Sequence, residues 1–486
     1  MELKRPVVVR MAPSPTGDAH VGHARTALYN YLFARQNNGT FIMRIDDTDT
    51  KRHVDDAEEG VLRALRWLGL DWDEGPDKPG PRGPYRQSER LDIYRQHVQQ
   101  LLDEGKAYEC FCSEEELAAE RAQQQAARQD IKYSGRCRSL TRDEREQFRA
   151  EGRVPTVRLI TPGEGVVGFH DLVRGWIQVE AAHIGDFVIL KSNGIPVYNF
   201  ATVVDDHLMG ISQVTRAAEH IANTPSQVLI YQALGWEVPQ FAHFSIMLNE
   251  DRSKMSKRMG ATFVGEYANM GYLPEAMLNF LAFLGWSPKG EVEDEILSLD
   301  ELLEKFSLED CSISNAVFDI KKLDWINAKW IRRLSAAELA ERMLPFLQKA
   351  GLVDGEVESS WLITLAKLVH ERLNRLDEAP QWLHYFFQEP ELPLADLVTT
   401  LKKQDAKQAG LEKIHAALQA SDWTEAGLEQ ALLQVQQEIG WSNRELFMGL
   451  RLIISGGKVS PPIYPTLEAL GREKTLARIQ RAIAAV

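Results

Sequence analysis

The sequence predicts an α/β domain at the amino-terminal end, with an α+β segment inserted into it, followed by helices up to the carboxyl terminus. Three observations support this fold class. Strand-like and helix-like runs alternate from residue 7 to residue 105. The pattern changes character over residues 107–196, and the alternation then resumes. From about residue 265 onward, the hydrophobic pattern is helical almost throughout.

The first elements follow from hydrophobic periodicity and from capping residues. The apolar run at 7–11 predicts a strand, and the helix predicted at 21–36 ends at Asn37-Asn38-Gly39, which is typical of a helix C-cap. The next predicted elements are a strand at 40–45, a helix at 55–68, a Pro/Gly-rich loop at 75–83 and a helix at 88–105.

The segment 107–196 combines a polar helix with short strands and therefore differs from its surroundings. Its predicted elements are a helix at 114–129 and strands at 156–160, 176–180 and 187–191. Because residues 197–204 and a helix predicted at 217–234 resume the earlier alternation, we interpret 107–196 as an insertion. Within it, GEGVVG at 163–168 fits the dinucleotide pattern G-x-G-x-x-G. The residues that follow predict loop and strand instead of the required helix, so we expect a hairpin.

Composition excludes several classes of protein. A hydrophobic fraction of 44% in 486 residues supports real cores and argues against a disordered chain. No run approaches the roughly 20 apolar residues of a membrane span. The net charge of −14 disfavours indiscriminate coating of nucleic acid. Four cysteines form no disulfide framework, so we expect a cytoplasmic protein without a membrane partner.

The sequence His20-Val21-Gly22-His23 lies where the first strand gives way to the first helix. Zinc ligation needs further ligands that are not nearby. The amino end of a helix attracts phosphate, Gly22 permits close approach of a nucleotide, and imidazoles can donate to phosphate oxygens. By itself, H-x-G-H also occurs by chance at an ordinary turn.

A second motif, which is basic, supports the interpretation of H-x-G-H as a phosphate-binding motif. Residues 253–258 read SKMSKR and contain Lys254 and Lys257, which can neutralise a triphosphate during nucleotidyl transfer. In isolation this stretch would be an ordinary basic surface loop. Together, H-x-G-H and K-M-S-K-R are similar to the paired motifs of class I aminoacyl-tRNA synthetases.

Longer segments narrow the resemblance to glutamyl-tRNA synthetases of the bacterial type. They are RMAPSPTGDAHVGHARTALYNYLFAR, RIDDTDTKR, YRQSERLDIYR, VYNFATVVDDHLMGI, NTPSQVLIYQALG and SKMSKR. The similarity runs from Arg10 to about Trp330 and continues more weakly to the carboxyl end.

The resemblance implies a domain organisation. A Rossmann-like catalytic domain comprises 1–106 and 197–245, and 107–196 form an inserted α+β subdomain that binds the tRNA acceptor end. Residues 246–332 form a stem-contact domain carrying the KMSKR loop, and 333–486 form a helical anticodon-binding region. Within that region, Trp423, Leu432, Leu433 and Leu446 are expected in the core.

The resemblance also implies roles for individual residues. The expected catalytic groups that handle phosphate are His20, His23, Lys254 and Lys257. The expected ATP-binding residues are Gly22, Glu219 and Lys257. The expected glutamate-binding residues are Arg10, Ala12, Ser14, Asp46, Tyr198 and Arg216.

Three positions depart from the family pattern. Asp46 stands where Glu is usual, Ala217-Ala218 follow Arg216 where the second position is usually acidic, and Thr202 replaces a common Val or Asn. The departures at Asp46 and Ala218 leave open a catalytically idle tRNA-binding paralogue.

Three cysteines and a tyrosine in the insertion are candidate zinc ligands. Cys110, Cys112, Tyr133 and Cys137 fit a version of the family's zinc site with C-x-C and Y-x-x-x-C. The alternative is a set of reduced structural cysteines left over from a lost site. Cys311 stands alone and is expected in the core.

The resemblance therefore implies a glutamate–tRNA ligase. It would use ATP with Mg²⁺ to form glutamyl-adenylate and would transfer glutamate to tRNA-Glu. Whether tRNA-Gln is also charged stays open. We expect a monomer.

Overall fold

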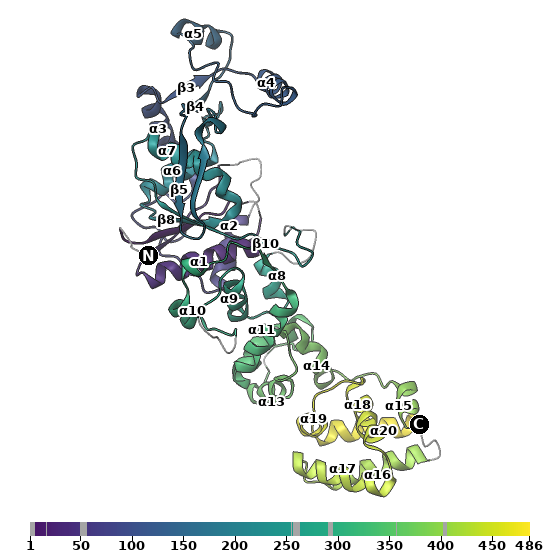
Figure 1. Ribbon diagram of the computed structural model, residues 1–486. Helices are drawn as coiled ribbons and strands as arrows, with labels where there is room; N and C mark the ends of the chain where they lie inside the picture. The colour runs from purple at the N-terminus through teal and green to yellow at the C-terminus, as the bar shows by residue number, and fades with distance from the viewer. Residues whose placement is uncertain are drawn as a thin grey trace. The chain divides into compact units, whose positions relative to one another are not determined.

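The computed structural model describes residues 5–15, 17–48, 56–253, 255, 263–289, 295–355, 357–401 and 406–486. The chain divides into two compact units (Figure 1). Unit 1 comprises Met1–Glu266 and Met277–Ile320, and unit 2 comprises Tyr267–Ala276 and Lys321–Val486.

Parallel strands form the centre of unit 1. Strand β1 (Val8–Met11) pairs in parallel with β2 (Thr40–Met43). A second sheet has the order β6-β5-β9-β8, in which β8 and β9 are parallel and β5 and β6 form a hairpin. Its strands are β5 (Val166–Asp171), β6 (Gly175–Glu180), β8 (Gln213–Ala217) and β9 (Gln240–Phe244). The Ser212 N–H donates to the Val8 carbonyl at 2.9 Å, which brings the start of β8 beside β1.

The hairpin confirms the expectation for GEGVVG, since β5 begins at Val166 and no helix follows. Asp171 pairs with Phe241 of β9, so this part of the predicted insertion extends the central sheet.

Helices connect the strands of unit 1, and most agree with the periodicity. They are α1 (Val21–Gln36), α2 (Ala57–Trp67), η1 (Gln87–Arg90), α3 (Leu91–Asp103), α6 (Tyr198–Leu208), η3 (Ala218–Asn223) and α7 (Thr224–Ala233). The helix predicted at 217–234 begins only at Thr224, because β8 runs to Ala217 and a 3-10 turn follows. Pro225 fits the first turn of α7, where no backbone N–H is needed.

The rest of the insertion forms its own small sheet, β3-β4-β7, with two polar helices (Figure 1). Its elements are β3 (Ala107–Cys110), α4 (Glu114–Ala126), α5 (Arg142–Ala150), β4 (Thr156–Leu159), η2 (Ala181–His183) and β7 (Val188–Leu190). Capping boxes at Ser113 and Thr141 start the helices.

Beyond β9, two short strands flank a group of helices. The elements are β10 (Met247–Leu248), α8 (Val264–Asn269), α9 (Pro274–Phe283), α10 (Leu299–Lys305), η4 (Leu308–Asp310) and β11 (Ala316–Val317). Strand β10 pairs with β11 in parallel. Cys311 is buried, as predicted.

Unit 2 is helical, as the periodicity predicts. Its helices are α11 (Ile320–Arg333), α12 (Ala336–Lys349), α13 (Ser359–Val369), η5 (Leu376–Glu378), α14 (Ala379–Phe387), α15 (Leu394–Thr400), α16 (Lys407–Ala420), α17 (Glu425–Ile439), α18 (Asn443–Ser455), α19 (Ile463–Leu470) and α20 (Arg472–Ala485). Leu432 and Leu446 are buried as expected, whereas Leu433 is 42% exposed, so its core assignment is wrong. In the described part of the chain, no helix has the length and apolar character of a membrane span.

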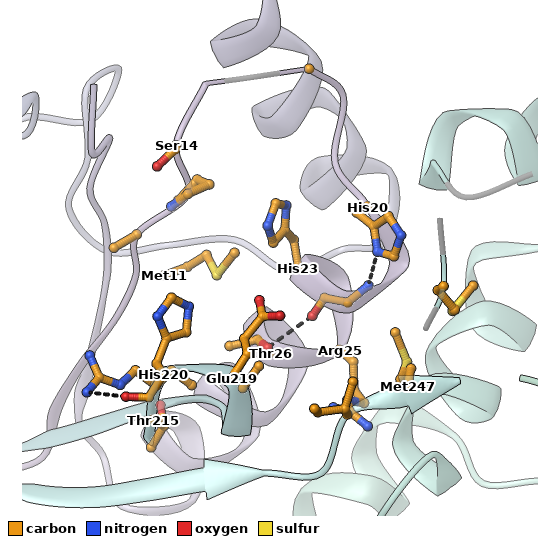
Figure 2. A pocket seen from close by; sticks show the side chains of 18 of the residues that line it. Met11, Ser14, His20, His23, Arg25, Thr26, Thr215, Glu219, His220 and Met247 are labelled. Atoms are coloured by element: carbon orange, nitrogen blue, oxygen red, sulfur yellow. Dashed lines mark hydrogen bonds between the residues drawn. The ribbon is translucent and has the colours of Figure 1, made fainter. Parts of the chain in front are cut away.

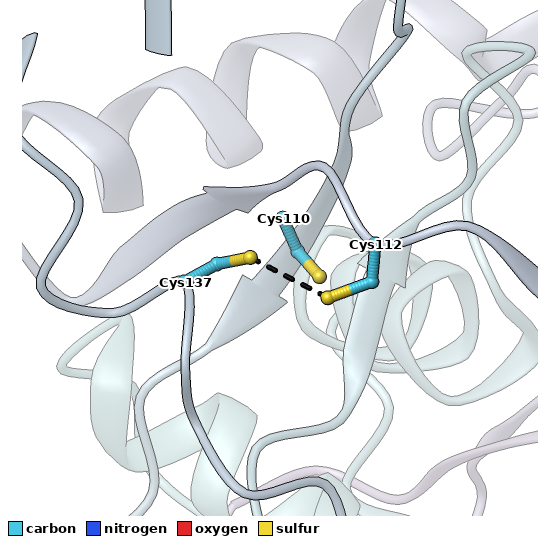
Figure 3. A group of neighbouring side chains, drawn as sticks. All are labelled: Cys110, Cys112 and Cys137. Atoms are coloured by element: carbon cyan, nitrogen blue, oxygen red, sulfur yellow. Dashed lines mark hydrogen bonds between the residues drawn. The ribbon is translucent and has the colours of Figure 1, made fainter. Parts of the chain in front are cut away.

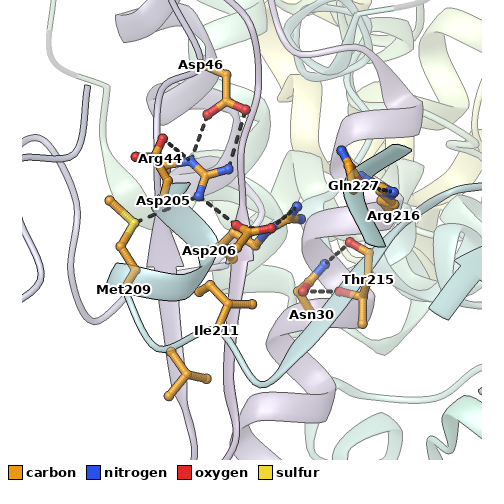
Figure 4. A network of polar contacts seen from close by, with 12 residues as sticks. Asn30, Arg44, Asp46, Asp205, Asp206, Met209, Ile211, Thr215, Arg216 and Gln227 are labelled. Atoms are coloured by element: carbon orange, nitrogen blue, oxygen red, sulfur yellow. Dashed lines mark hydrogen bonds and ion pairs between the residues drawn. The ribbon is translucent and has the colours of Figure 1, made fainter. Parts of the chain in front are cut away.

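A buried network of charges joins the elements around the first strands. Figure 4 shows Arg44 between Asp46 and Asp206, at 2.8 and 2.7 Å. Arg10 of β1 donates to both oxygens of Asp206, at 3.0 and 3.2 Å. The neighbouring Asp205 accepts from Arg90 at 2.6 Å.

Three arginines thus face three aspartates, and none of the six residues is more than 5% exposed. Further hydrogen bonds reach Asp205 from Gln87 at 2.9 Å and Tyr94 at 2.8 Å. Because each buried charge is paired, removal of one member leaves another uncompensated. The network therefore ties α6 to β1, to the segment after β2 and to η1 and α3.

Replacement of Arg44 by Met should destabilise unit 1 strongly, because three carboxylates lose their shared cation. We expect a loss of about 3–5 kcal/mol in the free energy of unfolding, measured as a lower midpoint in calorimetry. The control is Arg142→Met, which removes an ion pair whose arginine side chain is 89% exposed. Equal melting of the two variants would contradict a structural role for the network.

Candidate active site

A cavity of about 490 Å³ opens beside the amino end of α1 (Figure 2). It lies near the carboxyl ends of β1 and β8, which is where parallel α/β sheets bind ligands. The predicted site residues that line it are Arg10, Ala12, Ser14, His20, Gly22, His23, Tyr198, Arg216 and Glu219. The structure therefore brings together residues from four separate parts of the sequence.

His20 caps the helix that begins at Val21. Its Nδ1 accepts the Gly22 N–H at 3.0 Å, so a neutral ring carries its proton on Nε2. No acidic side chain occupies the first turn of α1, which leaves the positive end of the helix available to an anion. A Cβ at Gly22 would lie 3.3 Å from His20 Nδ1, so a side chain there would crowd the cap.

His23 lies one turn further along α1, with its ring centre 6.4 Å from that of His20. Burial, followed by the nearby His20, lowers the pKa of His23 to about 4, although Glu219 opposes the shift. At neutral pH this imidazole is therefore uncharged and can act on phosphate through a hydrogen bond. Its Nδ1 is buried and has no hydrogen-bond partner among the described residues.

Arg216, at the end of β8, is buried at the other side of the cavity. Its Nε donates to His243 Nε2 at 3.1 Å, and its Nη2 donates to Thr224 at 2.9 Å and Gln227 at 2.7 Å. Nη1 is buried and makes no hydrogen bond within the described part of the chain. An arginine held in this way has a donor group left for a ligand, and carboxylate is its best-matched acceptor.

Asp46 does not line the cavity. Its carboxylate binds Arg44 Nε at 2.8 Å, and its N–H donates to the Pro13 carbonyl at 3.0 Å. Burial raises the pKa of Asp46 to about 6, against the opposing effect of Arg44. Asp46, which was expected to bind glutamate, is thus paired within the charge network instead.

The remaining predicted residues fall into two groups. Tyr198 begins α6 and its hydroxyl lies 3.5 Å from His220 Nδ1, while Glu219 lies in η3. Lys254 and Lys257 lie outside the described residues.

Several lining residues were not predicted from the sequence. They include Met11, Asp18, Thr26, Thr215, His220 and Met247. Burial, followed by Arg216, lowers the pKa of His220 to about 4, which makes this ring neutral as well. In the sequence, only its position directly after Glu219 indicates that His220 could line the cavity.

The three cysteines of the insertion converge, as predicted (Figure 3). The sulfur atoms of Cys110, Cys112 and Cys137 lie within 4.8 Å of one another. The hydroxyl of Tyr133 lies 3.5 Å from Cys110 Sγ and 3.3 Å from Cys112 Sγ. Tetrahedral ligation at about 2.3 Å gives sulfur atoms about 3.8 Å apart, so the donor set fits zinc.

Two arginines border this cluster. Arg136 Nε donates to Cys112 Sγ at 3.1 Å, and the Arg158 guanidinium carbon lies 3.9 Å from the centre of the Tyr133 ring. Two positive charges therefore lie beside candidate ligands of the cluster.

Comparison with protein families covers most of the chain. Residues 6–325 match the family model "tRNA synthetases class I (E and Q), catalytic domain". Residues 338–483 match the model "Anticodon binding domain".

The similarity to curated relatives and to solved structures extends over nearly the full length of the chain. A protein named glutamate–tRNA ligase from Desulforamulus reducens is 44% identical over 98% of this chain and 99% of its own length. Another of the same name, from Listeria welshimeri, is 46% identical over 98% of each chain. The crystal structure of a glutamate tRNA ligase from Elizabethkingia meningosepticum, in complex with its amino acid, has a TM-score of 0.90. It is 33% identical and covers 99% of both chains.

Proposed function

Because the chain belongs to the class I tRNA synthetases for glutamate and glutamine and is a glutamate–tRNA ligase, we propose that its cavity activates L-glutamate with ATP. The observation that carries this proposal is a cavity with two different ends. One end has a helix terminus with H-x-G-H, and the other has a buried arginine with an unpartnered donor.

The reaction has two steps and needs no covalent bond to the protein. A carboxylate oxygen of glutamate attacks the α-phosphorus of ATP, and the bond to the β-phosphate oxygen breaks, which releases pyrophosphate. A terminal ribose hydroxyl of the tRNA then attacks the activated carbonyl. AMP leaves with the electron pair of the broken anhydride bond, and its phosphate takes the hydroxyl proton.

The phosphates lie, in this proposal, at the amino end of α1. The positive end of the α1 dipole attracts the phosphate oxygens, and the His20 Nε2–H donates to them as negative charge develops. Neutral His23 adds a hydrogen bond and Gly22 permits close approach. Lys254 and Lys257 add positive charge there, and Mg²⁺ bound with ATP would supply further neutralisation.

Glutamate occupies the Arg216 end. Arg216 Nη1 binds a substrate carboxylate, and Tyr198, Ala12 and Ser14 complete the pocket. Arg10, which Asp206 orients, lines the same wall of the cavity and adds a positive charge to the glutamate pocket. Asp46 reaches the substrate ammonium only if its carboxylate turns from Arg44, since that pair occupies it in this structure.

The tRNA extends, in this proposal, from the acceptor-binding segment 107–196 past 246–332 to an anticodon-binding region at 333–486. The match of residues 338–483 to an anticodon-binding family supports the last assignment. None of the four cysteines, all of which lie among the described residues, forms a disulfide, which supports the proposal of a cytoplasmic location. We expect a monomer.

The test is glutamate-dependent exchange of pyrophosphate into ATP in the presence of tRNA-Glu. We expect activity with glutamate, and a rate lowered by roughly a hundredfold or more in Lys257→Ala, because a stabilising charge on the transition state is lost. Affinity for tRNA should be unchanged.

The matched control is Lys289→Ala, which removes a lysine whose side chain is 77% exposed. This variant should exchange at the wild-type rate. No exchange by the wild type with any amino acid would identify a catalytically idle paralogue and refute the proposal.

We also propose one structural zinc ion, held by Cys110, Cys112, Cys137 and Tyr133. Elemental analysis of the purified protein should find about one zinc per chain, and Cys137→Ser should lower that content. Cys311→Ser serves as the control, since Cys311 lies outside the cluster and should leave the zinc content unchanged. A metal-free protein with wild-type melting and activity would reject the site.

A further inference from the structure

Arg216 is held by a chain of buried side chains that spans three neighbouring strands. Arg216 of β8 and His243 of β9 are direct neighbours in the parallel register. Asp171 ends β5, on the other side of β9. Arg216 Nε donates to His243 Nε2 at 3.1 Å, and His243 Nδ1 lies 2.6 Å from Asp171 Oδ2.

The hydrogen bonds specify which nitrogen of His243 carries a proton. An arginine Nε–H can only donate, so His243 Nε2 must be the acceptor and Nδ1 must carry the proton. That proton points at the Asp171 carboxylate, which also accepts the backbone N–H groups of Val173 at 3.0 Å and Arg174 at 2.9 Å. These hydrogen bonds keep the carboxylate ionised, and they lower the pKa of Asp171 despite its burial.

The His243 imidazole lies between the negative charge of Asp171 and the positive charge of Arg216. Burial lowers the pKa of His243, which favours the neutral ring. The groups bonded to Arg216 are therefore uncharged: the His243 ring, the Thr224 hydroxyl, the Gln227 amide oxygen and the His220 carbonyl. The Asp171 charge reaches Arg216 only through the ring, so the cation remains available to an anion in the cavity.

We propose that Asp171 and His243 are positioning residues that set the preference of the cavity for a carboxylate over a carboxamide side chain. Asp171 fixes the tautomer of His243, and His243 fixes the plane of the guanidinium, which leaves Nη1 as the donor without a partner among the described residues. A glutamate carboxylate completes the pairing of a buried cation, whereas a glutamine amide leaves it uncompensated. This inference rests on the proposed binding of the substrate carboxylate by Arg216.

The test is Asp171→Asn, which keeps the shape and changes the hydrogen bonding. The new amide N–H₂ donates to His243 Nδ1 and moves the ring proton to Nε2, where it opposes Arg216 Nε–H. We expect the KM for glutamate in pyrophosphate exchange to rise by roughly tenfold or more. The KM for ATP should change by less than about twofold, and the ratio of kcat/KM for glutamate over glutamine should fall.

The matched control is Asp186→Asn, which changes another buried aspartate that binds an arginine, Arg138, within the insertion. It should leave the KM for glutamate within about twofold of the wild type. If the role of Asp171 were purely structural, Asp171→Asn would lower the melting temperature and the fraction of active protein. It would then change the KM for glutamate no more than the KM for ATP.

Two variants of His243 keep the inference testable if Asp171→Asn does not fold. In His243→Gln the amide oxygen can still accept from Arg216 Nε, whereas His243→Leu offers no acceptor. We expect the KM for glutamate to be lower in His243→Gln than in His243→Leu. Equal values in the two variants, or an Asp171→Asn protein with wild-type KM and selectivity, would overturn the inference. Failure of the wild type to exchange with glutamate would instead overturn the proposed function.

Discussion

The arrangement of unit 1 depends on the compensation of buried charge around Arg44. Arg10, Arg44 and Arg90 meet Asp46, Asp205 and Asp206 where β1, the segment after β2, η1 and α6 come together. Isolated buried ions are strongly unfavourable, so these elements can pack only in a register that satisfies all the pairs. Arg10 belongs both to this network and to the cavity wall. The folded core and the site therefore share Arg10, whose guanidinium is held by Asp206.

The two ends of the cavity handle negative charge in different ways. At the α1 end, the His20 ring accepts the Gly22 N–H, and burial lowers the pKa of His23, so that the His23 imidazole is neutral. That arrangement suits phosphate, whose charge changes during the reaction. At the β8 end, Arg216 is a buried cation whose hydrogen-bond partners are uncharged. A fixed cation suits a carboxylate that stays ionised throughout.

Local patterns predicted the parts of the fold and site that are encoded over short distances. Helix α1, the hairpin after GEGVVG and the cysteine cluster follow from periodicity, turn residues and spacing, and H-x-G-H lies at the end of the cavity where we propose that phosphate binds. Pairings between distant residues were not predictable. Asp46 was expected in the cavity, but Arg44, two residues away, faces Asp206 and holds Asp46 in the network. Likewise, Asp171, Arg216 and His243 carry no common motif, because only the strand order β5-β9-β8 brings them together.

The most direct test of a cavity with a phosphate end and a carboxylate end is a crystal structure with a non-hydrolysable analogue of glutamyl-adenylate. The analogue's side-chain carboxylate should lie about 3 Å from Arg216 Nη1. Its phosphate-equivalent group should lie at the amino end of α1, near His20 and Gly22. An analogue bound with its side chain away from Arg216, or with the phosphate group away from α1, would contradict this division of the cavity.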